Sequence, residues 1–526
     1  MGMTRRDVMK ISVLSGAAVG LPVSHALGDS VSGNRIAESR LPKPFTKLFT
    51  RPEVAVPVRT DPLTGTQIYR IEMRPFRAEI VPGLVTDLWG YNGVYPGPTI
   101  VVDRNTPTRV RQINNLPRVH PTLGFTPWTS VHLHGHASLP QYDGYAGDIS
   151  NPGQYKDYEY QNVQEARTQW YHDHGVHHTA ETVQMGLAAF YLVHDELEQG
   201  LPIPHGDFDV PLMFADISFN ADGSVLFDNN DNKGLYGDVI MVNGQPWPVM
   251  PVKRRKYRFR FLNACPARSF KWSLDSGDTM TIIGTDAGLV PRPIPVKSFR
   301  HGVAERYEVV IDFAKYKKGD RITLRNAAPT NTISFTNTDK ALQFLVTDEP
   351  FDGADNEIPD PLNPDEPTML LKESDAKVTR RLDFVRKNGL WTINGTTWDD
   401  IVRSNFRQVV ASTRLNDVEV WELRNTSGGW HHPAHIHLID FKISSRNGQP
   451  AMPHERGPKD VVYLGENETV RLVIKFHDGT GRYMIHCHNL THEDHDMMTQ
   501  FEVVGPVGAP DPLGTPATDL PERTPL

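Results

Sequence analysis

The sequence has few cysteines. Only Cys265 and Cys487 occur among 526 residues, which excludes a disulfide-rich scaffold and allows at most one bridge. If Cys487 binds a metal, as argued below, no bridge remains. Cys265 is then expected to be a small buried hydrophobic residue.

Basic residues are not in excess, and long apolar runs are scarce. The 55 Lys and Arg residues stand against 63 Asp and Glu residues, a net charge of -8, so nothing favours a nucleic-acid partner. The apolar run at Ile11 to Leu21 is shorter than the roughly 20 residues that a membrane-spanning helix needs. We expect no transmembrane segment in the mature chain.

Residues 1–28 have the three-part layout of an export signal. The parts are a twin arginine with a following lysine, an apolar stretch and a small-x-small tripeptide: Arg5-Arg6 and Lys10, Ile11 to Leu21, and Ser24-His25-Ala26. The start resembles a twin-arginine signal, although Val8 and Met9 depart from the usual pattern. The alternative is a frayed amphipathic helix. We expect export to a bacterial periplasm or to the medium.

The remaining chain has the pattern of β-structure. The 41 glycines and 42 prolines are scattered, and short alternating runs such as 257–261 and 418–423 recur between turn signals. These features predict an all-β fold of mostly antiparallel Greek-key sandwiches. The best helical candidate is Thr179 to Val193.

The length predicts about three domains at roughly 150 residues each. We place the domains at 45–200, 201–365 and 366–505, with a Pro-rich linker at 349–367 and a loose Pro-rich tail at 506–526. An internal repeat supports this division, because 167–174 lines up with 481–488. The middle third has the strand pattern but lacks the histidine pairs of the other two.

Four His-x-His pairs dominate the candidate site: His132 and His134, His172 and His174, His435 and His437, and His486 and His488. Side chains alternate along a strand, so both members of a pair project from the same face and can serve two adjacent metals. Imidazole suits copper, zinc and iron alike. One such pair is weak evidence for a metal, whereas four pairs in one chain are strong evidence.

The fourth pair encloses Cys487, which faces away from its two neighbouring histidines. A metal on the thiolate would therefore lie on the other side of the strand from metals on the imidazoles. His492 and Met497 follow at five and ten residues, and His432 precedes the third pair. Together they are the donors of a blue-copper electron-transfer centre.

These segments resemble the four copper signatures of the multicopper oxidase family, in order and over nearly the whole mature chain. The segments are Ser130 to Gly135, Trp170 to Gly175, His432 to His437, and His486 to Met497. Further segments resemble the bilirubin oxidase and spore-coat laccase branch: Tyr95 to Thr99, Gly237 to Trp247, and His492 to Met498.

The resemblance implies three tandem cupredoxin-like domains and four copper ions. A type 1 copper would bind His432, Cys487, His492 and Met497, and a type 2 copper would bind His132 and His435. A type 3 pair would bind His134, His172, His174, His437, His486 and His488. Asp173 occupies the place of Cys487 in the first domain, which should therefore lack a blue copper.

The resemblance also implies an oxidase that takes single electrons from phenolic, aromatic amine or bilirubin-like donors and reduces O2 to water. Electrons would pass from Cys487 to His486 and His488. Asp143 and Glu493 match acids that relay protons in the resembled branch, or else they serve structure alone. We expect O2 and a small organic donor as partners, and a monomer.

Three alternatives remain open: a cuprous or other metal-ion oxidase, an exported copper-binding scaffold without turnover, and a zinc hydrolase. The first is disfavoured because the 14 methionines form no Met-rich cluster, and the last because it needs no Cys487. Trp430 either shapes the donor edge of the type 1 site or is a core residue. Five further histidines are interpreted as core or solvated: His136, His177, His178, His431 and His495.

Overall fold

The structure is a computed structural model that describes residues 34–349, 353–506 and 508–522. The predicted export signal at 1–28 lies outside the described residues. Within those residues, no helix is long and apolar enough to cross a membrane.

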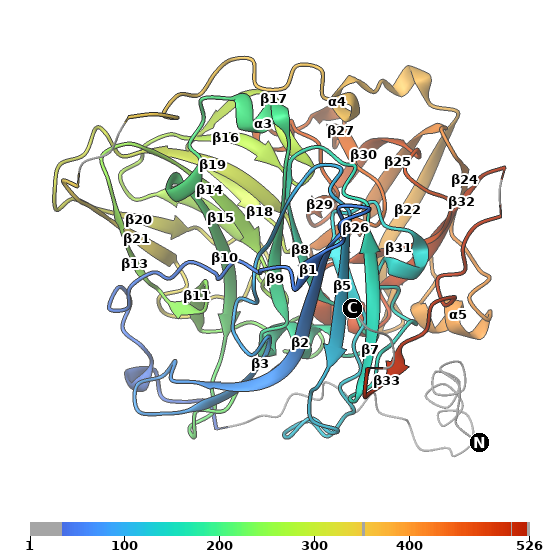
Figure 1. Ribbon diagram of the computed structural model, residues 1–526, viewed down its shortest axis with the longest axis horizontal. Helices are drawn as coiled ribbons and strands as arrows, with labels where there is room; N and C mark the ends of the chain where they lie inside the picture. The colour runs from blue at the N-terminus through green and yellow to red at the C-terminus, as the bar shows by residue number, and fades with distance from the viewer. Residues whose placement is uncertain (1–33, 350–352, 507, 523–526) are drawn as a thin grey trace.

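The described residues form six sheets, two for each third of the chain (Figure 1). In the first third, one sheet contains β1 (Arg59–Thr60), β2 (Gln67–Ala78), β3 (Thr86–Tyr91), β5 (Thr108–Asn114), β7 (Gln154–Tyr160) and β33 (Thr518–Asp519). The other sheet contains β4 (Ile100–Asp103), β9 (Ala188–His194), β8 (Arg167–Asp173) and β6 (Val131–His134). In the middle third, one sheet contains β12 (Gln245–Pro246), β11 (Val239–Val242), β10 (Asp209–Ile217), β14 (Lys256–Asn263), β19 (Arg306–Asp312), β16 (Met280–Thr285) and β17 (Gly288–Val296). The other sheet contains β13 (Val249–Val252), β21 (Lys340–Val346), β20 (Arg321–Asn326), β15 (Phe270–Leu274) and β18 (Ser298–His301). In the last third, one sheet contains β23 (Leu390–Ile393), β22 (Val378–Lys387), β25 (Val418–Asn425), β30 (Thr469–Lys475), β27 (Phe441–Arg446) and β28 (Gln449–Pro450). The other sheet contains β24 (Ser412–Arg414), β32 (Met498–Val504), β31 (Gly481–Cys487), β26 (His432–Ile436) and β29 (Val461–Leu464). This architecture confirms the predicted all-β fold of tandem cupredoxin-like domains, whereas the domain limits near residues 200 and 365 remain predictions.

The alternating runs form strands as predicted, but the face of β14 that would meet solvent in a single sheet is covered. Arg258 and Arg260 on this face are buried and pair with the carboxylates of Glu198 and Glu308. Glu198 belongs to the segment that connects the first domain to the middle one. Buried charges are tolerated only when they are paired, and this network fixes the connecting segment against the middle domain.

Helices are short and connect strands. They are α2 (Thr179–Met185), α3 (Glu196–Gly200), α4 (Pro367–Leu370), α5 (Trp398–Arg403) and α6 (Leu490–Asp494), with 3₁₀ turns η1 (Glu38–Arg40), η2 (Pro140–Tyr142), η3 (Gly206–Phe208), η4 (Glu373–Asp375) and η5 (Pro453–Glu455).

The helix expected from Thr179 to Val193 ends at Met185, so that prediction was wrong for its second half. Gly186 has a φ of 122°, and a Cβ there would lie 2.4 Å from the carbonyl oxygen of Trp89. The apolar run that follows is the buried strand β9, between β8 and β4. A short, uniformly apolar run carries no periodicity that separates helix from strand.

The C-terminal tail is not loose. Its strand β33 pairs with β7 of the first domain, where Thr518 is opposite Tyr155. The carboxylate of Glu522 then accepts hydrogen bonds from Arg70 and Arg111, at 2.9 and 2.7 Å. The described tail therefore returns from the third domain to the first (Figure 1). In contrast, residues 353–366 of the predicted linker contain no helix or strand.

Candidate metal centre

Two pairs of antiparallel strands present the predicted histidines. In the first domain, His132 of β6 lies opposite His172 of β8. In the third domain, His435 of β26 lies opposite His486 of β31. Since every second residue of a strand shares a face, the partner histidine of each pair projects the same way. All eight imidazoles therefore gather between the first and third domains.

The imidazoles form three groups of three whose ring nitrogens lie within 4.8 Å of one another. The groups are His132, His134 and His435; His134, His172 and His488; and His174, His437 and His486. The closest approaches join Nε2 atoms, at 3.4 Å between His132 and His435 and at 3.2 Å from His486 to each of His174 and His437. Converging nitrogens of this kind are typical of metal ligands.

Burial favours the neutral form of His172 and His174. None of the eight is more than 1% exposed, and desolvation lowers the pKa of His172 to about 3 and that of His174 to about 4. The outward nitrogens are held by the chain, since Nδ1 of His132 and of His435 contact the carbonyl oxygens of Asp143 and Asp460 at 2.6 and 2.9 Å. Such contacts fix the tautomer and leave the inward nitrogen as a lone-pair donor.

Several inward nitrogens have no hydrogen-bond partner among the described residues. They are Nδ1 of His134, Nε2 of His172 and both ring nitrogens of His488. Buried polar atoms left unsatisfied are costly and rare in folded proteins. Metal ions at this place would satisfy them, so the donor set fits a metal cluster.

A separate donor set lies on the other face of β31. The Sγ of Cys487 is 3.3 Å from Nδ1 of His432 and 3.6 Å from Nδ1 of His492, and these two nitrogens are 3.2 Å apart. Burial raises the pKa of the Cys487 thiol, so the thiolate form needs a bound cation. Ser427 and Asn489 contact the outer ring nitrogens of His432 and His492, at 2.7 and 3.3 Å.

Met497 lies in the same core as Cys487. It is fully buried, and its carbonyl oxygen accepts a hydrogen bond from the Cys487 amide at 3.0 Å. The backbone therefore brings both sulfur-bearing residues to one place, which is the arrangement that a soft axial thioether requires.

Comparison with known proteins identifies the family. Multicopper oxidase family models match residues 75–198 and 372–506. A bilirubin oxidase from Albifimbria verrucaria is 40% identical over 484 residues, which span 87% of this chain and 82% of that protein. The chain is a multicopper oxidase.

Other relatives agree with this family. A laccase from Bacillus subtilis (strain 168) is 33% identical over 480 residues, which span 80% of this chain and 91% of the laccase. The crystal structure of a laccase from Pediococcus acidilactici Pa5930 matches with a TM-score of 0.76 at 28% identity, covering 88% of this chain and 95% of that one. A metallo-oxidase from Campylobacter jejuni shares the fold with a TM-score of 0.75 at 22% identity, covering 90% of this chain and 98% of that one.

Family membership and the histidine groups together imply copper, and the chain is a copper-dependent oxidoreductase that uses O2. In the first domain of the oxidase, Asp173 occupies the place of Cys487. Its carboxylate accepts hydrogen bonds from the amides of Ser130 and Gly175 at 2.9 and 3.0 Å and from the Thr182 hydroxyl at 2.6 Å. Asp173 thus stabilises the local backbone by accepting hydrogen bonds from its amides. It belongs to none of the described groups of metal donors.

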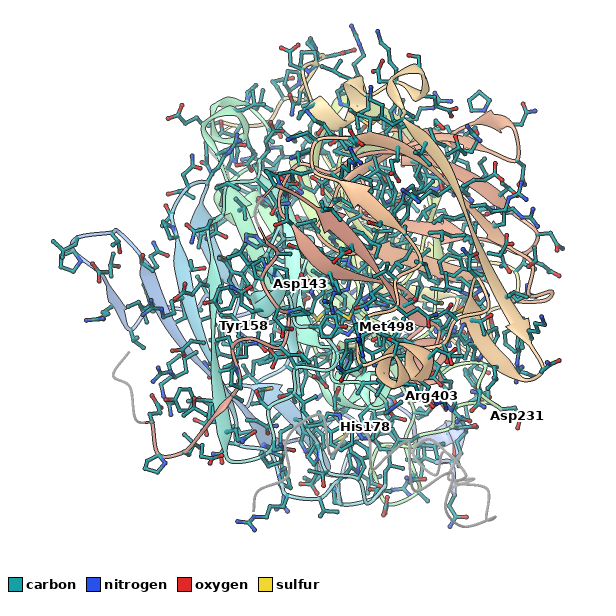
Figure 2. The ribbon with its side chains drawn as sticks, turned by 90° about the vertical axis from the view of Figure 1, so that its right-hand side faces the viewer. Asp143, Tyr158, His178, Asp231, Arg403 and Met498 are labelled. Atoms are coloured by element: carbon teal, nitrogen blue, oxygen red, sulfur yellow. The ribbon has the colours of Figure 1, made fainter. Side chains whose placement is uncertain are left out.

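The two predicted acids contact the imidazoles of the oxidase directly. Asp143 Oδ2 lies 2.8 Å from Nδ1 of His437, and Glu493 Oε2 lies 2.8 Å from Nδ1 of His486. Figure 2 shows Asp143 in the interior of the molecule. Burial raises the pKa of Asp143. Burial also acts to raise the pKa of Glu493, but the imidazoles of His486 and His174 outweigh it and lower that pKa to about 2.

The five additional histidines lie outside the donor groups of the described residues. His178 stacks on Phe125 with centroids 3.9 Å apart, and His431 stacks on Tyr463 at 5.0 Å. His136 packs against Tyr160, while His177 and His495 contact backbone carbonyl oxygens. These contacts agree with the interpretation of these residues as core or structural histidines.

Besides Ser427 and Asn489, sequence reasoning missed three further residues that contact the ligand imidazoles. Asp460 lies 3.2 Å from Nε2 of His134, Trp391 stacks on His492 at 3.9 Å, and Trp170 stacks on His172 at 4.1 Å. Trp170 begins the segment around the second histidine pair, but no sequence feature distinguishes it from a core tryptophan. Asp460 and Trp391 are distant in sequence from their partners, so only the tertiary fold reveals them.

Proposed function

We propose that this oxidase removes single electrons from an aromatic organic donor and reduces O2 by four electrons to water. The observation that carries the proposal is the position of Cys487. Its sulfur faces His432 and His492, while His486 and His488 on either side of it belong to the clustered imidazoles. The polypeptide itself thus connects the two donor sets through the peptide bonds on either side of Cys487.

The chain offers donors for four copper ions. We assign a type 1 copper to His432, Cys487, His492 and Met497, a type 2 copper to His132 and His435, and a type 3 pair to His134, His172, His174, His437, His486 and His488. When bound, copper supplies reversible one-electron chemistry at the thiolate site and a place for O2 among the imidazoles. The protein fixes the ring tautomers and excludes bulk water.

Aromatic rings cover the thiolate site and favour an aromatic donor. His432 and His492 are fully buried, so a donor cannot contact either ring directly. Trp391 stacks on His492, and the half-buried Trp430 stands perpendicular to Trp391 with ring centroids 5.2 Å apart. We infer that the donor docks against Trp430 and that its electron enters through this pair of indoles.

Two cations flank the indoles and favour an anionic donor over a metal ion. The guanidinium of Arg386 lies 4.9 Å from the Trp391 ring and 5.7 Å from the Trp430 ring, and Lys233 lies 6.0 Å from Trp430. Neither cation forms an ion pair with a described carboxylate. A cuprous or ferrous ion would be repelled here, whereas a donor that bears a carboxylate would be attracted.

Two roles fit the geometry of Asp143 and Glu493. Each carboxylate contacts one ligand imidazole at 2.8 Å, which suits both proton delivery and orientation of the ring. We propose proton delivery for both residues. Export to the periplasm or medium is likewise a proposal, and it depends on the sequence of residues 1–28 alone.

Metal analysis combined with oxygen uptake tests the proposed function. The purified chain is loaded with copper and supplied in turn with a phenol, with bilirubin and with Cu(I). We expect a blue protein with about four copper ions per chain, the number that the donor sets accommodate, and oxygen uptake with the organic donors. Colourless copper-loaded protein would contradict the type 1 assignment, uptake with Cu(I) alone would favour the metal-ion oxidase, and copper binding without uptake would favour the scaffold protein.

A further inference from the structure

One buried acidic residue contacts two ligand imidazoles of the cluster, one through its carboxylate and the other through its main-chain oxygen. Asp460 Oδ1 lies 3.2 Å from Nε2 of His134, and its main-chain oxygen lies 2.9 Å from Nδ1 of His435. With Nε2 of His134 held by Asp460, its Nδ1 has no partner among the described residues. For His435, the main-chain contact leaves Nε2 facing His132 at 3.4 Å.

The middle domain fixes the orientation of this carboxylate. Arg306, the first residue of β19, donates from Nη1 to Oδ1 of Asp460 at 2.6 Å and from Nη2 to Oδ2. A guanidinium that bridges both oxygens allows the carboxylate one rotation only. Oδ1 is thereby directed at His134.

Arg306 itself is fixed by contacts in two domains. Its Nε donates to the main-chain oxygen of Thr168 in the first domain, and its Nη2 donates to that of Asp286 in the middle domain, both at 2.9 Å. Asp286 also accepts the amides of Asp460 and Val461, at 3.2 and 3.1 Å. Arg306 and Asp286 are fully buried. The Arg306 side chain thus contacts residues of all three domains.

The loop after the first histidine pair is shaped around this contact. Gly135 has a φ of 88°, and a Cβ there would lie 2.6 Å from Nη2 of Arg306 and 2.9 Å from Oδ2 of Asp460. The backbone that follows His134 therefore packs directly against the ion pair. A glycine at this position is required both by its conformation and by the lack of space.

We propose that Arg306 is a positioning residue of the copper cluster. By orienting the Asp460 carboxylate, it sets which ring nitrogen of His134 faces the metals. The middle domain then helps to form the metal site, because its Arg306 orients a carboxylate of the third domain against a ligand histidine of the first. The inference depends on the proposed copper function, since it concerns how the same imidazoles are presented.

The test compares Arg306→Lys and Asp460→Asn with a matched control in copper-loaded full-length protein. Arg446→Lys is the control, since Arg446 is also buried and paired with a buried carboxylate, Glu455, but contacts no ligand histidine. The readouts are copper content after dialysis against a mild chelator, the blue absorption of the thiolate site, and the electron paramagnetic resonance of the remaining copper.

In both variants we expect copper affinity at the type 3 ligand His134 to fall by roughly 10- to 100-fold, the usual effect of removing an outer partner of a ligand histidine. The electron paramagnetic resonance of the remaining copper should change, while the blue absorption persists. Arg446→Lys should change neither. Copper content and spectra identical to the wild type in Arg306→Lys and Asp460→Asn would overturn the inference.

Failure of folding also gives an answer. If Arg306→Lys does not fold, Asp460→Asn decides the outcome, because it retains the side-chain volume. If neither folds while Arg446→Lys does, the pair serves folding rather than ligand geometry, and the inference is wrong. A wild-type protein that lacks blue absorption would instead contradict the proposed function, which separates the two failures.

Discussion

The indole of Trp391 stacks on the imidazole of His492, with ring centroids 3.9 Å apart and planes inclined by 29°. The stack covers a ligand of the thiolate site with a side chain that is only 1% exposed. Trp430 lies outside it, perpendicular to Trp391 and half-buried. Docking of the donor at Trp430, as proposed above, leads to the first prediction.

Trp430→Ala should lower kcat/KM for a phenolic donor by roughly two- to twelvefold, the equivalent of the ~0.5–1.5 kcal/mol of an aromatic pair. The blue absorption should be retained, because Trp430 lies outside the indole that covers His492. Steady-state oxygen uptake measures the effect. Trp128→Ala removes a half-buried indole in the first domain and serves as control. An equal loss in both variants would show that general loosening, not donor docking, is responsible.

Arg386→Gln and Lys233→Gln should each raise KM for a carboxylated phenol by roughly two- to fivefold, the equivalent of the ~0.5–1 kcal/mol of a surface ion pair. KM for the neutral phenol should be unchanged. Added salt should reduce the difference between the two donors, because exposed charges are screened. The control is Lys318→Gln, an exposed lysine of the middle domain. The anionic-donor assignment is wrong if both phenols respond equally.

Much of the candidate site was predictable because strands impose a period of two. That period indicated which histidines share a face. Five of the eight paired histidines lie in β6, β8, β26 and β31, and His174, His437 and His488 directly follow the ends of β8, β26 and β31. It also placed Cys487 on the opposite face from His486. Local spacing determines these relationships, so the sequence alone was sufficient for them.

Contacts between domains were not predictable, because local patterns do not contain them. Asp460 and His134 are 326 residues apart, and Arg306 lies in a domain without copper ligands. The tail was misinterpreted for a similar reason, since β33 has only two residues and its partner β7 lies in the first domain. Pairing of distant segments depends on the assembled tertiary structure.

Asp143→Asn separates the two roles of this carboxylate. The amide oxygen can still accept a hydrogen bond from Nδ1 of His437, but the side chain no longer delivers a proton. We expect oxygen turnover to fall by roughly 10²- to 10⁴-fold, the usual effect of general acid–base catalysis. Anaerobic bleaching of the blue absorption by donor should be unaffected. Turnover and a pH profile identical to the wild type would leave Asp143 with orientation alone.

Glu522→Gln should destabilise the first domain at neutral pH only. The pKa of Glu522 is lowered: burial opposes the change, and hydrogen bonds from Arg111 and Arg70 outweigh burial. A carboxylate with a lowered pKa stabilises the fold above its unfolded pKa, and this contribution is lost as the pH falls through the folded value.

We expect Glu522→Gln to cost about 1 kcal/mol, or roughly 2–4 °C of the thermal midpoint, at pH 7. The difference from the wild type should vanish in acid, below the folded pKa of Glu522. Thermal unfolding at several pH values measures it, with Glu38→Gln on the exposed turn η1 as control. A loss of stability that persists in acid would show that the ion pairs to Arg70 and Arg111 are not its source.

Two neighbouring methionines offer a matched test of the axial ligand. Met497 is fully buried in the core of Cys487, whereas Met498 is 1% exposed and packs in a different core with Met484 and Trp398 (Figure 2). Met-to-Leu substitutions nearly conserve volume and should cost less than about 1.5 kcal/mol at either position. Any difference between the two variants in redox behaviour therefore reports on the sulfur atom.

Met497→Leu should raise the reduction potential of the blue centre, because the lost thioether stabilises the oxidised ion. A tenfold change in relative affinity corresponds to about 59 mV for one electron. Met498→Leu should leave the potential unchanged. A redox titration of the blue absorption measures both. If Met497→Leu keeps the wild-type potential, Met497 is not an axial ligand, and the donors of the thiolate site reduce to His432, Cys487 and His492.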